Sequence, residues 1–178
     1  IGYRMQHEPN TQRIMQFAKQ KPYGDIKTII AEAGYNGTGA SYSWRADPAL
    51  GGGAMYDMGV YPLNAARYTA GEEPIAVTAT MNSTTEVYKN VDETTRFELE
   101  FASGARAVCA TSYAQSMNQL RAECAKGWYE LKPFQSYSGV KGSTSDGIIL
   151  PAAPENQQAR QMDNDALAII NNSRVLVP

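Results

Sequence analysis

Alternating hydrophobic and polar positions predict a run of strands in the second half of the chain. The segments follow at the spacing of an antiparallel meander, with a tight turn at Ser103 and Gly104. They are PIAVTATMNS (74–83), DETTRFELEF (92–101), GARAVCATSYA (104–114) and NQLRAECA (118–125). Within the second segment, Phe97, Leu99 and Phe101 alternate with charged residues. We therefore expect one face of this sheet to be buried and the other to be polar or covered by a partner.

Helical spacing appears before this run. Ile14, Phe17 and Ala18 recur at helical intervals after Asn10, and Pro22 ends the pattern. The β-branched segment DIKTIIAEAGY (25–35) is then expected to form a strand.

Helical spacing returns at the end of the chain. After a short strand and a Tyr-rich loop in 127–139, the segment 155–173 reads as a polar-rich helix with Met162, Leu167 and Ile170 facing inward. The order of elements predicts an α+β fold, with helices on one face of a large, mostly antiparallel open sheet. A wide apolar outer face of that sheet would favour assembly.

Composition narrows the classes of function. A chain of 178 residues suits one domain, and a net charge of -2 with a pI near 5.5 argues against nucleic acid as a partner. No apolar run reaches the ~20 residues of a membrane span, so we expect a soluble protein without a membrane partner. Cys109 and Cys124 are expected to be buried thiols that bridge only if neighbouring strands bring them together. With His7 as the only histidine, we expect no metal site and no serine-histidine-aspartate triad.

The candidate chemistry lies in GGGAMYDMGVYPLNAARYTAG (51–71). Its glycines do not form the G-x-G-x-x-G fingerprint of a dinucleotide-binding fold. They are expected either to let the backbone pass close to a ligand or another domain, or to form a tight entry to the following helix. Asp57 and Tyr61 are four residues apart, so both side chains can face one cleft. A carboxylate can orient a sugar hydroxyl, and a phenol can act as an acid or base. The alternatives are a helix-terminal carboxylate for Asp57 and a core position for Tyr61.

Three segments carry a family resemblance: IGYRMQHEP (1–9), WRADPALGGGAMYDMGVYPLNAARYTAGEEP (44–74) and MDNDALAIINN (162–172). Together they resemble the C-terminal domain of the glucose-fructose oxidoreductase, inositol dehydrogenase and MocA family, closest to its glucose-fructose oxidoreductase branch. The resemblance implies a single substrate-binding and oligomerisation domain over residues 1–178. In such proteins an N-terminal Rossmann domain holds NADP or NAD and carries a catalytic lysine. Both would be absent from this chain, which would then be inactive alone.

The resemblance also implies roles for single residues. Tyr61 matches the group that exchanges a proton with the sugar oxygen, and Asp57 matches a carboxylate that positions the substrate. Three further positions match residues that contact the cofactor in the family: Trp44, Arg45 and Tyr137. The alternatives are a core aromatic position for Trp44 and a surface ion pair for Arg45.

The partners implied by the resemblance are a sugar or polyol and further copies of the chain. The copies would form a homodimer or homotetramer through the open sheet face, and either the periplasm or the cytoplasm suits the family. A non-catalytic oligomerisation or carbohydrate-binding module is the alternative. Tyr3 and Arg4 are expected to close the junction between the two domains.

Overall fold

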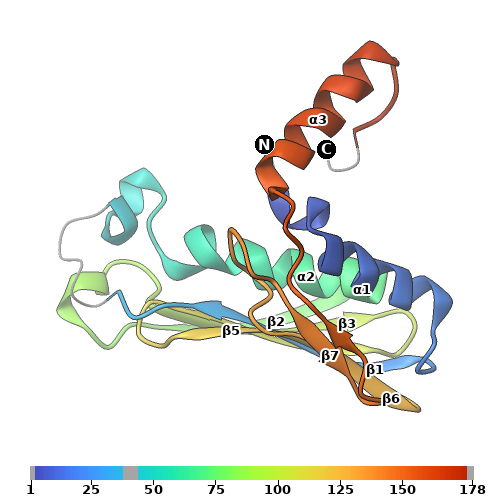
Figure 1. The fold of residues 1–178 in the computed structure, drawn as a ribbon. Coiled ribbons are helices and arrows are strands. Elements are labelled where there is room, and N and C mark those ends of the chain that lie inside the picture. The colour runs from blue at the N-terminus through green and yellow to red at the C-terminus, as the bar shows by residue number, and fades with distance from the viewer. Residues whose placement is uncertain (1–2, 38–43, 176–178) are drawn as a thin grey trace.

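The structure, a computed structural model, describes residues 3–37 and 44–175. One eight-stranded sheet forms the base of the molecule, and α1 and α2 lie across one of its faces (Figure 1). The strands are β1 (Ile26–Gly34), β2 (Pro74–Asn82), β3 (Thr94–Phe101), β4 (Arg106–Ser112), β5 (Met117–Cys124), β6 (Gly127–Leu131), β7 (Gly142–Thr144) and β8 (Ile149–Leu150). The helices are α1 (Pro9–Gln20), α2 (Val60–Ala70) and α3 (Gln157–Ile170), with short helical turns η1 (Arg4–His7), η2 (Trp44–Ala46), η3 (Pro48–Leu50), η4 (Met55–Gly59) and η5 (Glu86–Tyr88). The expected α+β fold is confirmed.

The strand order is β2-β3-β4-β1-β5-β6-β7-β8. Only β1 and β4 run parallel, so β1 lies inside the predicted meander and separates β4 from β5. This insertion also separates Cys109 on β4 from Cys124 on β5, and both thiols are free. Burial raises their pKa values, to about 12 for Cys109 and about 11 for Cys124.

The core lies between the sheet and the two helices that cover it. Phe97, Leu99 and Phe101 are buried there as predicted, and the first two lie opposite the small residues Cys109 and Ala107 of β4. Helix α1 begins where the Glu8 carboxylate accepts a hydrogen bond from the backbone N–H of Thr11, and it ends at Lys21 in the left-handed conformation. Helix α2 lies over β1 and β4, and its N-terminal end lies near the C-terminal end of β4, where Gly59 meets Thr111 (Figure 1).

The outer face of the sheet is polar, as one of the two expected alternatives had it, and it is not the wide apolar face that would favour assembly. It carries eight charged side chains, Glu32, Arg96, Glu98, Glu100, Arg106, Arg121, Glu123 and Glu130. Arg106 forms an ion pair with Glu100 at 2.7 Å, and Arg121 forms ion pairs with Glu123 at 2.6 Å and Glu130 at 3.7 Å. The Arg121 guanidinium also stacks on Trp128, with its carbon 4.0 Å from the ring centroid. Strand alternation predicted both the buried face and the polar face correctly, but pairing between the charges of different strands could not be read from the alternation.

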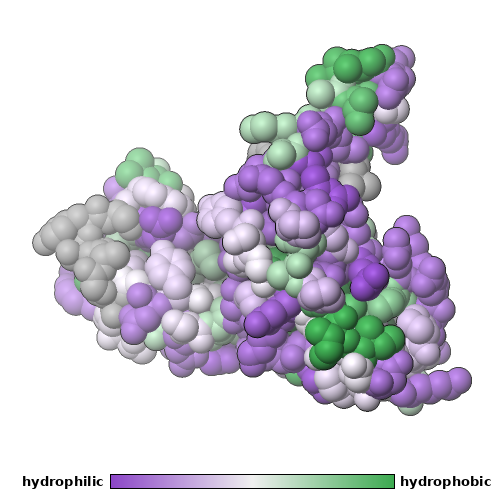
Figure 2. All heavy atoms as spheres, in the orientation of Figure 1, coloured by the Kyte–Doolittle hydropathy of each residue, from purple (hydrophilic) through white to green (hydrophobic). Residues whose placement is uncertain are grey.

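Helix α3 differs from the prediction in a second way. It rises away from the sheet, and its main contact is with η1 (Figure 1). Met162, Leu167 and Ile170, predicted to face inward, are 70%, 55% and 77% exposed, whereas Gln157 and Ala168 are buried. Figure 2 shows hydrophobic side chains gathered at the free end of this helix. The prediction of a helix here was correct. Among the described residues, however, nothing covers most of the apolar side of α3. None of the described helices has the length and apolar content that a bilayer crossing requires.

Candidate active site

The glycine run brings a short turn against the start of the helical segment that follows it. Gly52 and Gly53 donate backbone hydrogen bonds of 2.9 Å to the carbonyls of Asp47 and Arg45. A Cβ on Gly52 would lie 2.6 Å from the Arg45 carbonyl oxygen, and one on Gly53 would lie 2.1 Å from an Asp92 carboxylate oxygen. The run therefore sets a tight helix entry, one of the predicted roles, and its close approach is to the chain's own η2 turn.

The helical segment begins as a π-helical turn, η4, before it continues as α2. The Asp92 carboxylate accepts a hydrogen bond of 2.8 Å from the backbone N–H of Met55, and the Asp92 carbonyl accepts one from Ala54. Gly59 packs this turn directly onto Thr111 of β4. Single π-helical turns within helices are frequent at functional sites, and this one contains Asp57.

Asp57 is held by a cation and a phenol. Arg45 Nε donates a hydrogen bond of 2.7 Å to its carboxylate, and the Tyr113 hydroxyl donates one of 3.1 Å to the same oxygen. Burial, and then the nearby Asp57 charge, raise the pKa of Tyr113 far above its ordinary value, so this phenol remains a donor. Asp57 therefore acts here as an anchored anion that fixes Arg45, whose guanidinium carbon lies 4.7 Å from the Trp44 ring centroid.

Tyr61 lies on the first turn of α2 and is half-buried. Its ring centroid is 5.9 Å from that of Tyr3, whose hydroxyl donates a hydrogen bond of 3.4 Å to the Tyr61 carbonyl oxygen. The guanidinium carbon of Arg4 lies 5.9 Å from the Tyr61 ring centroid and 4.2 Å from that of Tyr137. Tyr61 also packs against the main core but is only partly buried, so part of its side chain remains accessible to solvent.

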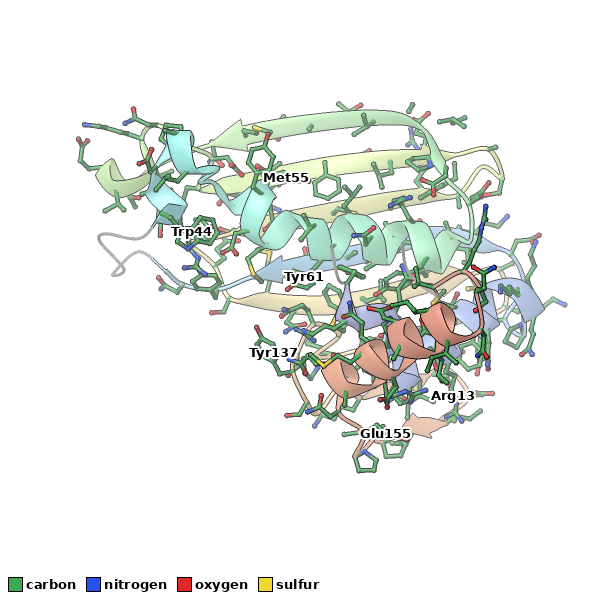
Figure 3. The ribbon with its side chains drawn as sticks, turned by 90° about the horizontal axis from the view of Figure 1, so that it is seen from above. Arg13, Trp44, Met55, Tyr61, Tyr137 and Glu155 are labelled. Atoms are coloured by element: carbon green, nitrogen blue, oxygen red, sulfur yellow. The ribbon has the colours of Figure 1, made fainter. Side chains whose placement is uncertain are left out.

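The five predicted residues form two adjoining groups. Trp44, Arg45 and Asp57 are joined by direct contacts, whereas Tyr61 and Tyr137 are joined through Arg4. Figure 3 shows Trp44, Tyr61 and Tyr137 around the N-terminal end of α2, on the helix-bearing side of the sheet. Trp44 is 43% exposed, so it is not a core aromatic residue. Arg45 forms an ion pair with Asp57, as the alternative interpretation of that residue expected.

Sequence reasoning missed the residues behind Asp57. Tyr113 is fully buried, and its hydroxyl oxygen lies 3.1 Å from both the Gly53 carbonyl oxygen and the Asp57 carboxylate, so its single hydrogen is shared between the glycine run and Asp57. The Tyr35 ring packs against that of Tyr113 at an angle of 60°, with ring centroids 5.4 Å apart, and burial raises the pKa of Tyr35. Both tyrosines flank strands rather than the glycine segment, so only the sheet pairing brings them to the site. The described residues contain no cluster of three or more His, Cys, Asp or Glu side chains that could hold a metal ion.

The chain belongs to the GFO/IDH/MocA oxidoreductase family, because residues 11–130 match the model of that family's C-terminal domain. It is similar to the aldose-aldose oxidoreductase of Caulobacter crescentus, whose structure with glycerol aligns with 99% of this chain at a TM-score of 0.91 and 32% identity. It is also 33% identical, over 63% of its length, to D-xylose 1-dehydrogenase [NADP(+)] of Haloarcula marismortui.

A putative myo-inositol dehydrogenase of Sinorhizobium meliloti shares the fold, at 17% identity over 99% of this chain and a TM-score of 0.73. The chain covers 55% of the Caulobacter protein, 56% of the Sinorhizobium protein and 32% of the Haloarcula enzyme.

Proposed function

We propose that this chain is the substrate-binding and oligomerisation domain of an NAD(P)-dependent sugar oxidoreductase. The observation that carries the proposal is the placement of the half-buried Tyr61 four residues after Asp57, which Arg45 anchors, with exposed Trp44 and Tyr137 on the same side of the sheet (Figure 3). Relatives whose names state oxidation of a sugar support the substrate class.

Oxidation of a sugar C–OH group removes a hydride from carbon and a proton from oxygen. In this proposal the Tyr61 hydroxyl group takes part in the transfer of that proton. Asp57, fixed by Arg45 and Tyr113, holds one wall of the site in a constant position while the sugar binds. When bound, the nicotinamide supplies the hydride acceptor.

The exposed side chains fit contact with a cofactor that is held mainly by another domain. The exposed ring of Trp44, with Arg45 stacked on it, offers an aromatic and cationic surface. Tyr137, 68% exposed, offers a second aromatic face. These three residues would contact NADP or NAD from the substrate side.

Assembly is the second part of the proposal. The outer face of the sheet would meet a second copy, forming a homodimer or homotetramer. Because that face carries charges of both signs, the contact would rely on complementary ion pairs around Ile30, Val108 and Trp128. The apolar side of α3 would pack against the cofactor-binding domain.

The test is an assay of the full-length protein that contains this chain. Purified protein is mixed with NADP⁺ or NAD⁺ and a panel of aldoses and inositols, and the absorbance of the reduced cofactor is followed, with a reaction lacking sugar as the control. We expect sugar-dependent reduction with at least one aldose. Binding of sugars without reduction of either cofactor would instead favour the non-catalytic module.

A further inference from the structure

A buried arginine lies between the two tyrosines of the candidate site. Arg4, in η1, is only 8% exposed, and its guanidinium carbon is 4.2 Å from the Tyr137 ring centroid and 5.9 Å from that of Tyr61. Its Nη2 atom has no hydrogen-bond partner among the described residues. Burying such a cation is costly, so its position calls for compensating contacts.

Those contacts connect three segments that are distant in the sequence. Arg4 Nη1 donates hydrogen bonds of 2.6 Å to the Ser136 carbonyl oxygen and 2.5 Å to Gln157 Oε1. Gln157 Nε2 donates a hydrogen bond of 3.0 Å to the same Ser136 carbonyl, which closes a triangle. The triangle joins η1, the loop between β6 and β7, and the first residue of α3.

We propose that Arg4 is a positioning residue that fixes the Tyr61 and Tyr137 rings relative to each other. Tyr137 lies next to Ser136 in an exposed loop, so the hydrogen bond to Ser136 and the stacked guanidinium together restrict its ring. The same guanidinium faces Tyr61, so a single planar cation sets the spacing of both rings. The inference rests on the proposed function for its effect on turnover, but the geometric coupling can be measured without it.

Arginine is needed for this role because its planar guanidinium can stack and donate hydrogen bonds at the same time. Arg4→Met keeps much of the side-chain volume and removes both properties. Arg4→Lys keeps the charge and a donor but loses the planar face. Arg13, an exposed arginine of α1 that lies away from Tyr61 in Figure 3, provides the matched control as Arg13→Met.

The experiment combines spectroscopy with kinetics on the full-length protein. Tyrosines are replaced by 3-fluorotyrosine, and the ¹⁹F resonances of Tyr61 and Tyr137 are assigned from Tyr61→Phe and Tyr137→Phe spectra. In Arg4→Met we expect both resonances to move, kcat to fall about 10- to 100-fold and KM for the cofactor to rise. Arg13→Met should change none of these quantities.

The outcomes separate positioning from a general loss of folding. A purely structural role would lower the folded fraction but leave the KM and the two resonances of the folded protein unchanged, and that result would overturn the proposal. If Arg4→Met does not fold, Arg4→Lys takes its place, with the same shifts expected and the same result overturning the proposal.

Shifted resonances with unchanged kcat and KM in an active enzyme would also contradict the proposal. If the wild-type protein shows no turnover, the proposed function fails. Movement of both resonances in Arg4→Met would then still support the positioning of the two rings by Arg4, and unchanged resonances would overturn it.

Discussion

At the scale of single residues, the ion pair between Asp57 and Arg45 controls how the site is held. The two side chains are 17% and 33% exposed, so solvent screens the pair only in part. The hydrogen bond to Asp57 raises the pKa of the Arg45 guanidinium, which therefore remains charged. The Tyr113 hydroxyl adds a second, neutral donor from below.

Asp57→Asn tests the charge without changing the shape of the side chain. We expect turnover of the full-length enzyme to fall at least about tenfold, because the ion pair between Asp57 and Arg45 is lost. If Asp57 and Tyr61 serve one proton transfer, the double variant with Tyr61→Phe should lose less activity than the product of the two single losses. Steady-state kinetics of the three variants measure this coupling. Fully multiplicative losses would show that the two residues act independently.

At the scale of elements, the site depends on the junction between η2 and η4. A Cβ on Gly52 would meet the Arg45 carbonyl oxygen at 2.6 Å and the Asp47 carbonyl oxygen at 2.8 Å. Gly52→Ala should therefore displace the turn that carries Trp44 and Arg45 and cost about 1–3 kcal/mol of unfolding free energy. Denaturant unfolding measures the loss.

The neighbouring glycine offers a matched control for that prediction. Gly51 has a φ of 76° and open space around its Cβ position, so Gly51→Asn meets no clash. Asparagine tolerates the left-handed conformation, and this change should cost about 1 kcal/mol or less. Equal losses for the two variants would show that the close approach at Gly52 is unimportant.

The elements also show which part of the fold the sequence predicts. Helix α1, strand β1 and the strands from β2 to β6 follow from local periodicity, because each is recognised from its own pattern of hydrophobic and polar residues. The insertion of β1 between β4 and β5 does not follow, because pairing between distant segments leaves no local pattern. The π-helical turn at Asp57 and the support from Tyr113 were likewise invisible, since both depend on contacts between segments.

At the scale of the whole molecule, the chain offers few groups for a cofactor's pyrophosphate. Recognition of that group in a Rossmann domain uses the fingerprint G-x-G-x-x-G between a strand and a helix, and the glycines at 51–53 do not form that fingerprint. We expect the isolated chain to fold and to bind NADP negligibly in titration calorimetry. Binding with a Kd of about 10 µM or tighter would contradict the division of labour between two domains.

Assembly is tested on the outer face of the sheet. Light scattering should show a dimer or larger species at ~100 µM, and salt should weaken it because the face is charged. Val108, 46% exposed on β4, lies on this face, and Val108→Glu should shift the protein towards monomer. Val77, 66% exposed on the edge strand β2 and paired with the buried Leu99, points to the other side, so Val77→Glu is the control. Equal effects of the two substitutions would place the contact elsewhere.

The central claim is that this chain supplies the proton-transfer group of a sugar oxidoreductase, and Tyr61→Phe in the full-length protein tests it most directly. The substitution removes the hydroxyl and keeps the ring that packs against Tyr3 and the core. The measurement is kcat, with the thermal midpoint recorded on the same samples. We predict a fall in kcat of ~10²-fold or more with an almost unchanged midpoint. An unchanged kcat together with a stability loss of about 2 kcal/mol or more would show that Tyr61 is a core residue and contradict the claim.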